Sequence, residues 1–410
     1  MSYQNQPIDS LSETSEPSWL QRSDAKLVGT LDFDKFGAAS CLSANGLVLA
    51  VGAPYSNGGG AGLDSGSVQV YEYVDGNSYQ PRGPIMNGTA YGDTFGWAVS
   101  LSNDGALLAV GAPNSTGVGY VKVYKYDGEK YNEVINISER AYVGELFGYS
   151  ISLSGDGKTL AVGAPEGGYA VLFIIDVESG TYYAYPEMSA QYFYGYELGH
   201  SVSVSDDGKV LAAGDSLLYK PDADYESSYQ LVCTMIGEAA TLSGDGTRFA
   251  VRNQTSAIVS VYSINAARAE CLQVGQSIPL TTTPPPSSDS YDPTMLMSLS
   301  FDGHVLAVAN PLNKKGVQVY EEKYNSTGQL EYAARGDAVP IADSASVSLS
   351  DDGRVLAIGI PFRDLGNGQY EDNGSMLVYE WPLQSRGGST PPPSPVSHIV
   401  EPNCLRFSNE

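Results

Sequence analysis

The sequence is poor in basic residues and in histidine. Its 410 residues contain 22 Lys and Arg against 47 Asp and Glu, a net charge of −25, and three His. So acidic a chain repels a nucleic-acid backbone, which excludes nucleic acid as a partner. Of the three histidines, His398 lies in the C-terminal tail, His304 follows a predicted turn, and His200 alone is expected near the axial mouth of the fold. We therefore expect no catalytic constellation, no metal site and no cofactor, and a protein that is not an enzyme.

Long apolar runs are also absent. No run approaches the roughly 20 residues that a membrane helix needs, and residues 1–18 lack the basic and apolar blocks of a signal peptide. We expect a monomer that does not insert directly into a membrane.

Cysteine is scarce, and asparagine sequons are frequent. Cys233 and Cys271 occupy similar places in neighbouring repeats, so a bridge is conceivable, but two separate thiols are the simpler interpretation. Six Asn-x-Ser/Thr sequons in or near predicted turns favour an extracellular or cell-surface location over a cytoplasmic one. These candidate glycosylation sites are Asn87, Asn114, Asn136, Asn253, Asn325 and Asn373.

What the sequence does have is an internal repeat. A Ser, one residue, Asn or Asp, Gly, two residues and an apolar run recur seven times, as in SNDGALLAVGAP from position 102. The turn glycines are Gly46, Gly105, Gly157, Gly208, Gly246, Gly303 and Gly353.

Each repeat predicts four short strands. The Asn-Gly or Asp-Gly pair suits a tight hairpin turn, and LLAVGAP is apolar on both faces, as a strand between two neighbours must be. A β-forming run such as 120–126 and a more polar run such as 131–137 follow. Ser, Ala and Gly dominate the first strand of each repeat, which suits a crowded axis. The pattern predicts an all-β fold, a seven-bladed β-propeller of four-stranded antiparallel blades.

The two ends of the chain are expected to share the last blade. Only two strands follow the seventh turn, at 354–360 and 375–381, so this blade has three strands of its own, and residues 19–29 resemble the fourth strand of the first repeat at 79–88. Sharing the blade would close the ring and remove exposed strand edges. We therefore predict a propeller over 19–381, a flexible segment over 1–18 and a Pro/Ser-rich tail over 382–410.

The repeats resemble FG-GAP repeats, the blade unit of integrin α-subunit propellers. The Phe-Gly half is matched at 36–37, 95–96 and 147–148, and the Gly-Ala-Pro half at 52–54, 111–113 and 163–165. The resemblance covers residues 30–381 and weakens from the fourth blade. Many FG-GAP blades carry a longer Asp-rich calcium loop, and this sequence has only a short turn there, so we carry over no calcium site.

The loops expected on one face of the propeller carry two groups of candidate ligand-binding residues. The first is aromatic, with one histidine, on blades two to four: Tyr91, Trp97, Tyr142, Tyr149, Tyr192, Phe193, Tyr194, Tyr196 and His200. Aromatic rings with polar tips suit protein or glycan contacts, although Trp97 and Tyr149 also suit blade packing. The second group is acidic, on the long loops of blades seven and one, and would attract a cation or a basic partner if it does not simply solvate the loops: Asp64, Asp364, Glu371 and Asp372.

Three functions remain open at this stage. The first is a non-catalytic recognition or adhesion propeller that binds a protein or a glycan through this face. The second is a lectin-like or polysaccharide-active propeller of the glycosidase or lyase class. The third is an intracellular WD40-like scaffold, against which the absence of the Trp-Asp ending of the third strand argues.

Overall fold

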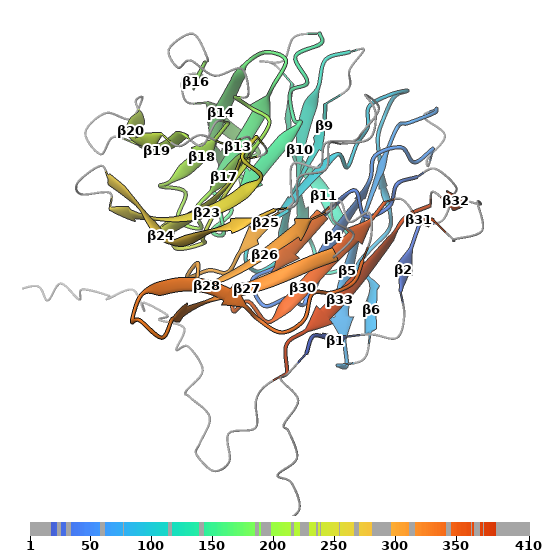
Figure 1. The fold of residues 1–410 in the computed structure, drawn as a ribbon. Helices are drawn as coiled ribbons and strands as arrows, with labels where there is room; N and C mark the ends of the chain where they lie inside the picture. Colours follow the sequence, from blue (N-terminus) through green and yellow to red (C-terminus); the bar gives the residue numbers. More distant parts are fainter. Residues whose placement is uncertain are drawn as a thin grey trace, which may run out of the picture.

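The computed structural model is built of β-strands arranged in successive sheets around a common centre (Figure 1). It describes residues 18–22, 26–29, 34–57, 62–76, 78–113, 117–138, 143–184, 188–189, 198–214, 217–221, 229–234, 237, 239–253, 255–265, 270–280, 297–310, 316–341, 346–361, 363–364, 370–371 and 373–382. Within this part of the chain no helix is long and apolar enough to cross a membrane.

The first four repeats each form one antiparallel sheet, and the first strand of each sheet is innermost. The first sheet contains β3 (Ala39–Leu42), β4 (Val48–Ala53), β5 (Ser67–Val74), β6 (Ser78–Pro81) and β7 (Met86–Asn87). The second contains β8 (Ala98–Leu101), β9 (Leu107–Ala112), β10 (Tyr120–Tyr126) and β11 (Tyr131–Ile137). The third contains β12 (Ser150–Leu153), β13 (Thr159–Ala164), β14 (Tyr169–Asp176), β15 (Thr181–Ala184) and β16 (Met188–Ser189). The fourth contains β17 (Val202–Val204), β18 (Leu211–Ala213), β19 (Leu217–Pro221) and β20 (Tyr229–Thr234).

The remaining three repeats continue the same order. The fifth sheet contains β21 (Ala239–Leu242), β22 (Arg248–Asn253), β23 (Ile258–Asn265) and β24 (Glu270–Pro279). The sixth contains β25 (Met297–Leu299), β26 (Val305–Asn310), β27 (Gly316–Tyr324) and β28 (Leu330–Ala334). The seventh contains β29 (Ser346–Leu349), β30 (Val355–Ile360) and β33 (Ser375–Glu380), joined by β1 (Leu20–Gln21) and β2 (Leu27–Val28). A small hairpin of β31 (Arg363–Asp364) and β32 (Tyr370–Glu371) lies between β30 and β33.

Each blade has four strand positions, as predicted, but in three of these sheets the outermost position is not one continuous strand. The first, third and seventh sheets have five strands each, because their outermost position is divided between two short strands that pair with the same neighbour. In the first sheet, for example, β6 and β7 both pair with β5. A break in the outermost strand leaves the inner ladder intact, since only one edge of that strand is paired.

The repeated Ser-x-Asp/Asn-Gly segment forms the same turn in all seven sheets. In the second blade the Ser102 hydroxyl donates to Asp104 Oδ1 (2.7 Å) and accepts from the Leu107 amide (2.9 Å). The carboxylate also accepts from the Ala106 amide (2.9 Å). The turn glycines all have φ between 64° and 70°, a conformation that favours glycine. The motif is therefore conserved within the chain for local reasons, and its carboxylates serve as turn formers.

A second set of serines links neighbouring blades around the axis. The innermost strand of each blade has one edge without a strand partner, so its amides need acceptors from elsewhere. At six blade junctions a side chain from the preceding blade accepts such an amide, for example Leu153 N to Ser100 Oγ (2.9 Å) and Leu42 N to Ser348 Oγ (2.9 Å). Cys41 takes the place of the serine in the first blade, where its Sγ accepts from Leu101 N (3.3 Å). Serine is thus abundant near the axis as a hydrogen-bonding residue as well as a small one.

The glycines of the Phe-Gly and Gly-Ala-Pro pairs meet at blade junctions. A Cβ atom on Gly111 of the second blade would lie 2.1 Å from the carbonyl oxygen of Gly148 in the third. Cβ atoms on Gly52 and Gly359 would likewise lie 2.0 Å from carbonyl oxygens in the next blades, those of Gly96 and Gly37. The paired phenylalanines Phe95 and Phe147 are completely buried, as expected for blade-packing residues.

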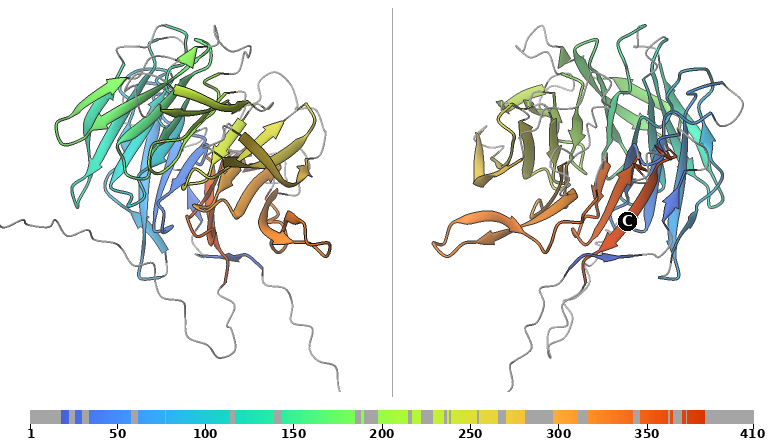
Figure 2. Two further views of the ribbon diagram at one scale, coloured as in Figure 1. Left: turned by 90° about the vertical axis from the view of Figure 1, so that its left-hand side faces the viewer. Right: turned by 45° about the vertical axis from the view of Figure 1, so that its right-hand side comes forward.

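The N-terminal segment completes the last blade, as expected. β1 pairs with β33 through Leu20 and Glu380, and β2 pairs with β33 through Leu27 and Met376. Figure 1 shows the blue β1 beside the red β33. Trp19 is 8% exposed and packs with its ring 5.3 Å from that of Trp381. The ring is therefore closed by strands from both ends of the chain (Figure 2).

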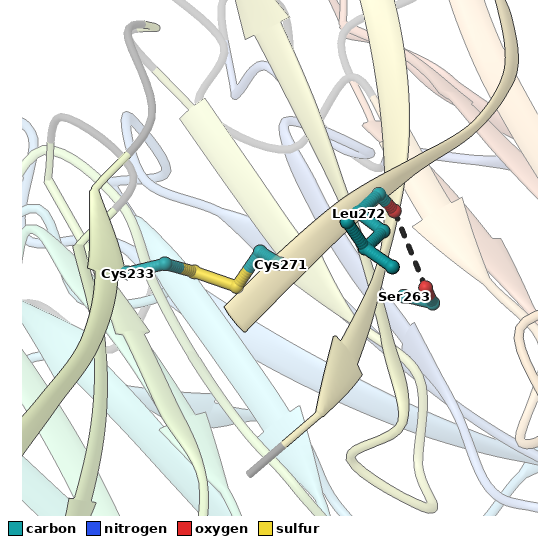
Figure 3. Close-up of a disulfide and its surroundings, with 4 residues drawn as sticks. All are labelled: Cys233, Ser263, Cys271 and Leu272. Atoms are coloured by element: carbon teal, nitrogen blue, oxygen red, sulfur yellow. Dashed lines mark hydrogen bonds between the residues drawn. A yellow bond between two sulfur atoms is a disulfide. The ribbon is translucent and has the colours of Figure 1, made fainter. Parts of the chain in front are cut away.

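Cys233 and Cys271 form a disulfide, so the interpretation of two separate thiols is wrong. The bond joins β20 of the fourth blade to β24 of the fifth (Figure 3). Beside it the Ser263 hydroxyl donates to the Leu272 carbonyl (3.2 Å), which holds β23 and β24 together. Cys41 is a free thiol, and burial raises its pKa to about 11.

Candidate functional site

A cavity of about 300 Å³ opens on the loop face where the first three blades meet. In the part of the chain that the structure describes, its wall combines four aromatic rings with one carboxylate and includes no Lys, Arg or His. The lining residues are Tyr55, Asp64, Tyr91, Gly92, Thr94, Trp97, Pro113, Leu146 and Tyr149. They come from the β4–β5 loop, the loop between the first two blades, the end of β9 and the loop before β12. A mostly apolar cavity with a few polar groups is the usual form of a small-ligand site.

A buried carboxylate fixes one of the loops that build this wall. Asp93 is 4% exposed, and its Oδ2 accepts from the Thr89 amide (2.9 Å), the Ala90 amide (2.9 Å) and the Tyr120 hydroxyl (2.8 Å). Burial and the Asp93 contact raise the pKa of Tyr120 far above its usual range, so this hydroxyl stays a donor. The loop that carries Tyr91 and its neighbours is therefore held in place before any ligand arrives.

Asp64 is held by its backbone and presents its side chain to the cavity. Its amide donates to Asn57 Oδ1 (2.9 Å), and its carbonyl accepts from the Thr94 amide (3.0 Å). The φ angle of Asp64 is +55°, a left-handed conformation that costs a non-glycine residue about 1 kcal/mol. In the described part of the chain, its carboxylate makes no hydrogen bond or ion pair. This carboxylate is thus available to a ligand.

Two other lining residues share the left-handed conformation, but for another reason. Thr94 (φ +53°) and Leu146 (φ +57°) each precede a Phe-Gly pair, and Lys35 (φ +52°) does the same in the first blade. Their conformation therefore belongs to the repeat. Asp64 is outside this series, so its conformation belongs to the loop that forms the cavity.

The aromatic rings form a continuous arc across four blades. Tyr55 and Trp97 have ring centroids 6.4 Å apart, Trp97 and Tyr149 5.3 Å, and Tyr149 and His200 5.5 Å. Trp97, Tyr149 and His200 each follow the glycine of the Phe-Gly position in successive blades. Burial, and then the Asp64 charge, raise the pKa of Tyr55, so its hydroxyl is neutral at pH 7 and able to donate.

The structure brings together residues that the sequence placed in two separate groups. Tyr91, Trp97 and Tyr149 of the aromatic group line the cavity with Asp64 of the acidic group, and His200 lies next to Tyr149. Tyr142, Tyr192, Phe193, Tyr194, Tyr196 and Asp372 lie outside the described residues, as does Asn114. Only the backbone of Asp364 and Glu371 is described, in the β31–β32 hairpin, so their predicted convergence with Asp64 stays a prediction.

Several residues of this site were not among the predicted site residues. Tyr55 could have been predicted, because it directly follows the Gly-Ala-Pro segment and belongs to the same loop as Asp64. Asp93 had no signal, because its role depends on the Tyr120 hydroxyl that reaches it from β10.

A second cavity of about 200 Å³ follows the propeller axis. Serine hydroxyls from the inner strands line it, and Asn103, Asp206 and Asp351 lie at its turn end. Asn103 Nδ2 donates to Asp206 Oδ2 (2.6 Å). Burial raises the pKa of Asp351 to about 6, with the charges of Asp206 and Asp352 adding to the effect. Among the residues that the structure describes, no group of three or more His, Cys, Asp or Glu side chains is placed to hold a metal ion.

Comparisons with known proteins support the fold and do not name a family. No family model matches the chain, and no curated protein matches its sequence. The resemblance to FG-GAP repeats therefore stays a prediction.

Similar solved structures are β-propellers and lactonases. The periplasmic gluconolactonase PpgL of Pseudomonas aeruginosa aligns with a TM-score of 0.53 at 19% identity, over 89% of this chain and 100% of that chain. The Swd1 β-propeller domain of Myceliophteria thermophila aligns with a TM-score of 0.54 at 13% identity, over 87% of this chain and 99% of that domain. A putative 6-phosphogluconolactonase of Bacteroides fragilis aligns with a TM-score of 0.52 at 15% identity, over 79% and 92%. At these identities the likeness shows the β-propeller fold alone.

These matches correct the expectation that the protein is not an enzyme. That expectation came from the shortage of histidine and from the view of a propeller as a recognition scaffold. Because proteins described as lactonases share the architecture over most of their length, the fold and the histidine count give no ground to exclude catalysis.

Proposed function

We propose that the protein recognises a carbohydrate through the loop-face cavity. The observation that carries this proposal is the combination, in one cavity, of four aromatic rings with the carboxylate of Asp64. A sugar ring has apolar C–H faces that pack on aromatic rings, and hydroxyl groups that need hydrogen-bond partners at its edge. Asp64 accepts from such hydroxyls, and the neutral Tyr55 hydroxyl both donates and accepts. This favours the lectin-like or polysaccharide-active interpretation of the sequence over adhesion to a protein.

The fixed loops support a binding role for this cavity. Hydrogen bonds to Asp93 from Thr89, Ala90 and Tyr120 hold the loop around Tyr91, and backbone hydrogen bonds tie that loop to residues 63–65. Gly92 N donates to Leu63 O (3.1 Å), and Phe95 N donates to Ser65 O (3.1 Å). A wall that is ordered in advance loses little conformational entropy on binding.

A glycan array followed by calorimetric titration of the best ligand tests the proposal. Tyr91 is 63% exposed, so Tyr91→Ala removes a stacking ring without opening the core, and should weaken binding about tenfold. Tyr324→Ala is the matched control, because Tyr324 is 77% exposed at the end of β27. Equal affinity of the Tyr91 variant and the native protein would place the ligand elsewhere.

Hydrolysis of a sugar lactone is a second candidate function. It is favoured by the similar structures described as gluconolactonase and as putative 6-phosphogluconolactonases. Among the described residues that line the cavity Asp64 is the only carboxylate, so it would act as the general base that activates water. Acid release from gluconolactone above the spontaneous rate, lost in Asp64→Asn, would support this candidate. A rate equal to the spontaneous rate would reject it for this substrate.

We also propose that the protein matures in an oxidising compartment and acts outside the cytoplasm. The Cys233–Cys271 bond supports this, because structural disulfides form and persist in such compartments. Asn136 of β11 is exposed, and Asn87, Asn253, Asn325 and Asn373 are half-buried, which makes Asn136 the most accessible of the described sequons. Mass spectrometry of protein from its natural source should show the disulfide, and a glycan on Asn136 if the host glycosylates secreted proteins. Two free thiols at Cys233 and Cys271 would reject the proposal.

A further inference from the structure

The charge distribution of the cavity restricts which carbohydrate it accepts. Asp64 is the only charged residue among the described residues that line it, and the protein as a whole carries a charge of −25. An acidic sugar or a sugar phosphate would bring a second negative charge beside the Asp64 carboxylate and into this negative field. Two like charges repel each other strongly in a partly desolvated cavity, so the affinity for such a sugar is lowered.

The aromatic wall favours the opposite charge. Aromatic faces carry negative electrostatic potential, and four rings around one cavity attract a cationic group. One of the four rings already has a cation, since Lys35 Nζ lies 4.0 Å from the centroid of the Tyr55 ring, which leaves the rings of Tyr91, Trp97 and Tyr149 for a ligand. An ammonium group in the cavity would add an ion pair with Asp64 to this attraction.

The backbone geometry keeps Asp64 ready for such a group. Its amide is bound by Asn57 and its carbonyl by the Thr94 amide, so the loop is fixed on both sides of the side chain. In the described residues the carboxylate has no hydrogen-bonding or ionic partner that a ligand would have to displace. A fixed carboxylate without a partner is the arrangement expected of a group that binds a cation from outside.

We infer that the cavity selects amino sugars, with the ligand ammonium paired to Asp64 and the sugar ring packed on the aromatic wall. This inference rests on the proposed carbohydrate function and names its ligand class. Neutral sugars with the same ring geometry bind more weakly, and acidic or phosphorylated sugars bind most weakly. The ligand class therefore differs from the phosphorylated sugar acid derivative that two of the similar structures are named for.

Three trisaccharides that differ at one position give the sharpest test. The β-1,4-linked trimers of glucosamine, N-acetylglucosamine and glucose share their linkage and carry an ammonium, an acetamide and a hydroxyl group at C2. Titration calorimetry at about pH 6 keeps the amine of the glucosamine trimer protonated. We expect the glucosamine trimer to bind about tenfold more tightly than the other two at low salt, and this preference to shrink as salt is added.

Asp64→Asn should remove the preference, so that the glucosamine trimer binds no more tightly than the two neutral trimers. Asp75→Asn is the matched control, because Asp75 belongs to the same blade, has the same left-handed conformation (φ +54°) and lies at the opposite face between β5 and β6. That variant should keep the preference. Lys35→Gln, which removes a positive charge beside Tyr55, should raise the affinity for the glucosamine trimer.

The outcomes separate the inference from the function on which it rests. Equal binding of the three trimers, or a preference that persists in Asp64→Asn, overturns amino-sugar selection while carbohydrate binding stands. Failure of all three trimers and of every glycan on the array overturns both.

Discussion

The junctions of the first three blades and those of the next three share the serine hydrogen bonds and differ in the glycine contact. At the junctions that follow blades one, two and three, a glycine of one blade lies against the carbonyl of a glycine in the next, as at Gly111 and Gly148. In blades five and six, Arg252 and Ala309 occupy the position of the first of these glycines. A disulfide joins blades four and five, and the ion pair of Arg248 with Glu322 (2.9 Å) joins blades five and six.

The difference shows what the repeat motif does in this molecule. The glycine contact brings neighbouring backbones together at the loop face, and the aromatic cavity lies among the blades that use it. Where the motif is lost, a disulfide joins blades four and five and an ion pair joins blades five and six. Blades four to six are therefore joined to one another without the glycine contact.

Removal of residues 1–30 is expected to have the largest effect, because both halves depend on a closed ring. It deletes β1, β2 and Trp19, and leaves the β33 edge unpaired. We expect insoluble or opened protein, measured by soluble yield and by thermal melting. Deletion of residues 1–17 is the control and should leave melting unchanged. Native-like melting of the longer deletion would mean that the ring does not need this strand.

Loss of the disulfide should be the next largest effect, and it concerns the junction of blades four and five, where the glycine contact is absent. Cys233 and Cys271 are separated by 38 residues, for which the chain-entropy account gives about 3–4 kcal/mol. Cys271→Ser should lower the free energy of unfolding by that amount in urea titrations. Cys41→Ser should change it by less than about 1 kcal/mol, because serine fills the equivalent place in other blades. A large loss of unfolding free energy in Cys41→Ser, with no loss in Cys271→Ser, would contradict this prediction.

A methyl group at a glycine junction should damage the motif-rich half. In Gly111→Ala the new Cβ would lie 2.1 Å from the Gly148 carbonyl, and backbone must move to admit it. We expect a loss of about 2–3 kcal/mol in unfolding free energy. The reciprocal change at the matching place in blade six, Ala309→Gly, should cost only about 1 kcal/mol. Similar losses at both positions would show that the two kinds of junction are equally tight.

The smallest effect on stability is expected from Asp351 at the propeller axis, which the inner strands of both regions line. Asp351 has its pKa raised from 3.8 to about 6, so the folded protein holds a proton there that the unfolded chain has released. Stability from this group is complete below about pH 4 and is lost as the pH rises through 6. Because Asp351 is partly exposed, solvent screening limits the expected loss of unfolding free energy to about 1 kcal/mol.

Asp351→Asn should therefore be more stable than the native protein at pH 8 and equal to it at pH 4. The control is Asp75→Asn, because Asp75 is exposed. A stability difference that does not change with pH would contradict this explanation.

Local motifs explain why much of the fold was predictable. The Ser-x-Asp/Asn-Gly turn is made by atoms within six residues, as Ser102, Asp104 and Leu107 show, so its period in the sequence is the period of the blades. The shared last blade also left a trace, since residues 19–29 resemble the strand whose place they take.

The disulfide and the cavity were harder because they depend on how blades face one another. Cys233 and Cys271 belong to outer strands of different blades, and their distance is set by a junction that the sequence does not encode locally. Asp64 and Tyr91 were assigned to separate groups, although hydrogen bonds such as that from Thr94 N to Asp64 O join their loops. Sequence patterns identify the loops of such a site, and the packing of three blades decides which side chains meet.

The most direct test of the account is a crystal structure of the protein soaked with the β-1,4-linked glucosamine trimer. The account predicts a sugar ring against Trp97 and Tyr91, with its amine within hydrogen-bonding distance of the Asp64 carboxylate. A trimer bound on the other face or in the axial cavity, with the loop-face cavity empty, would contradict it.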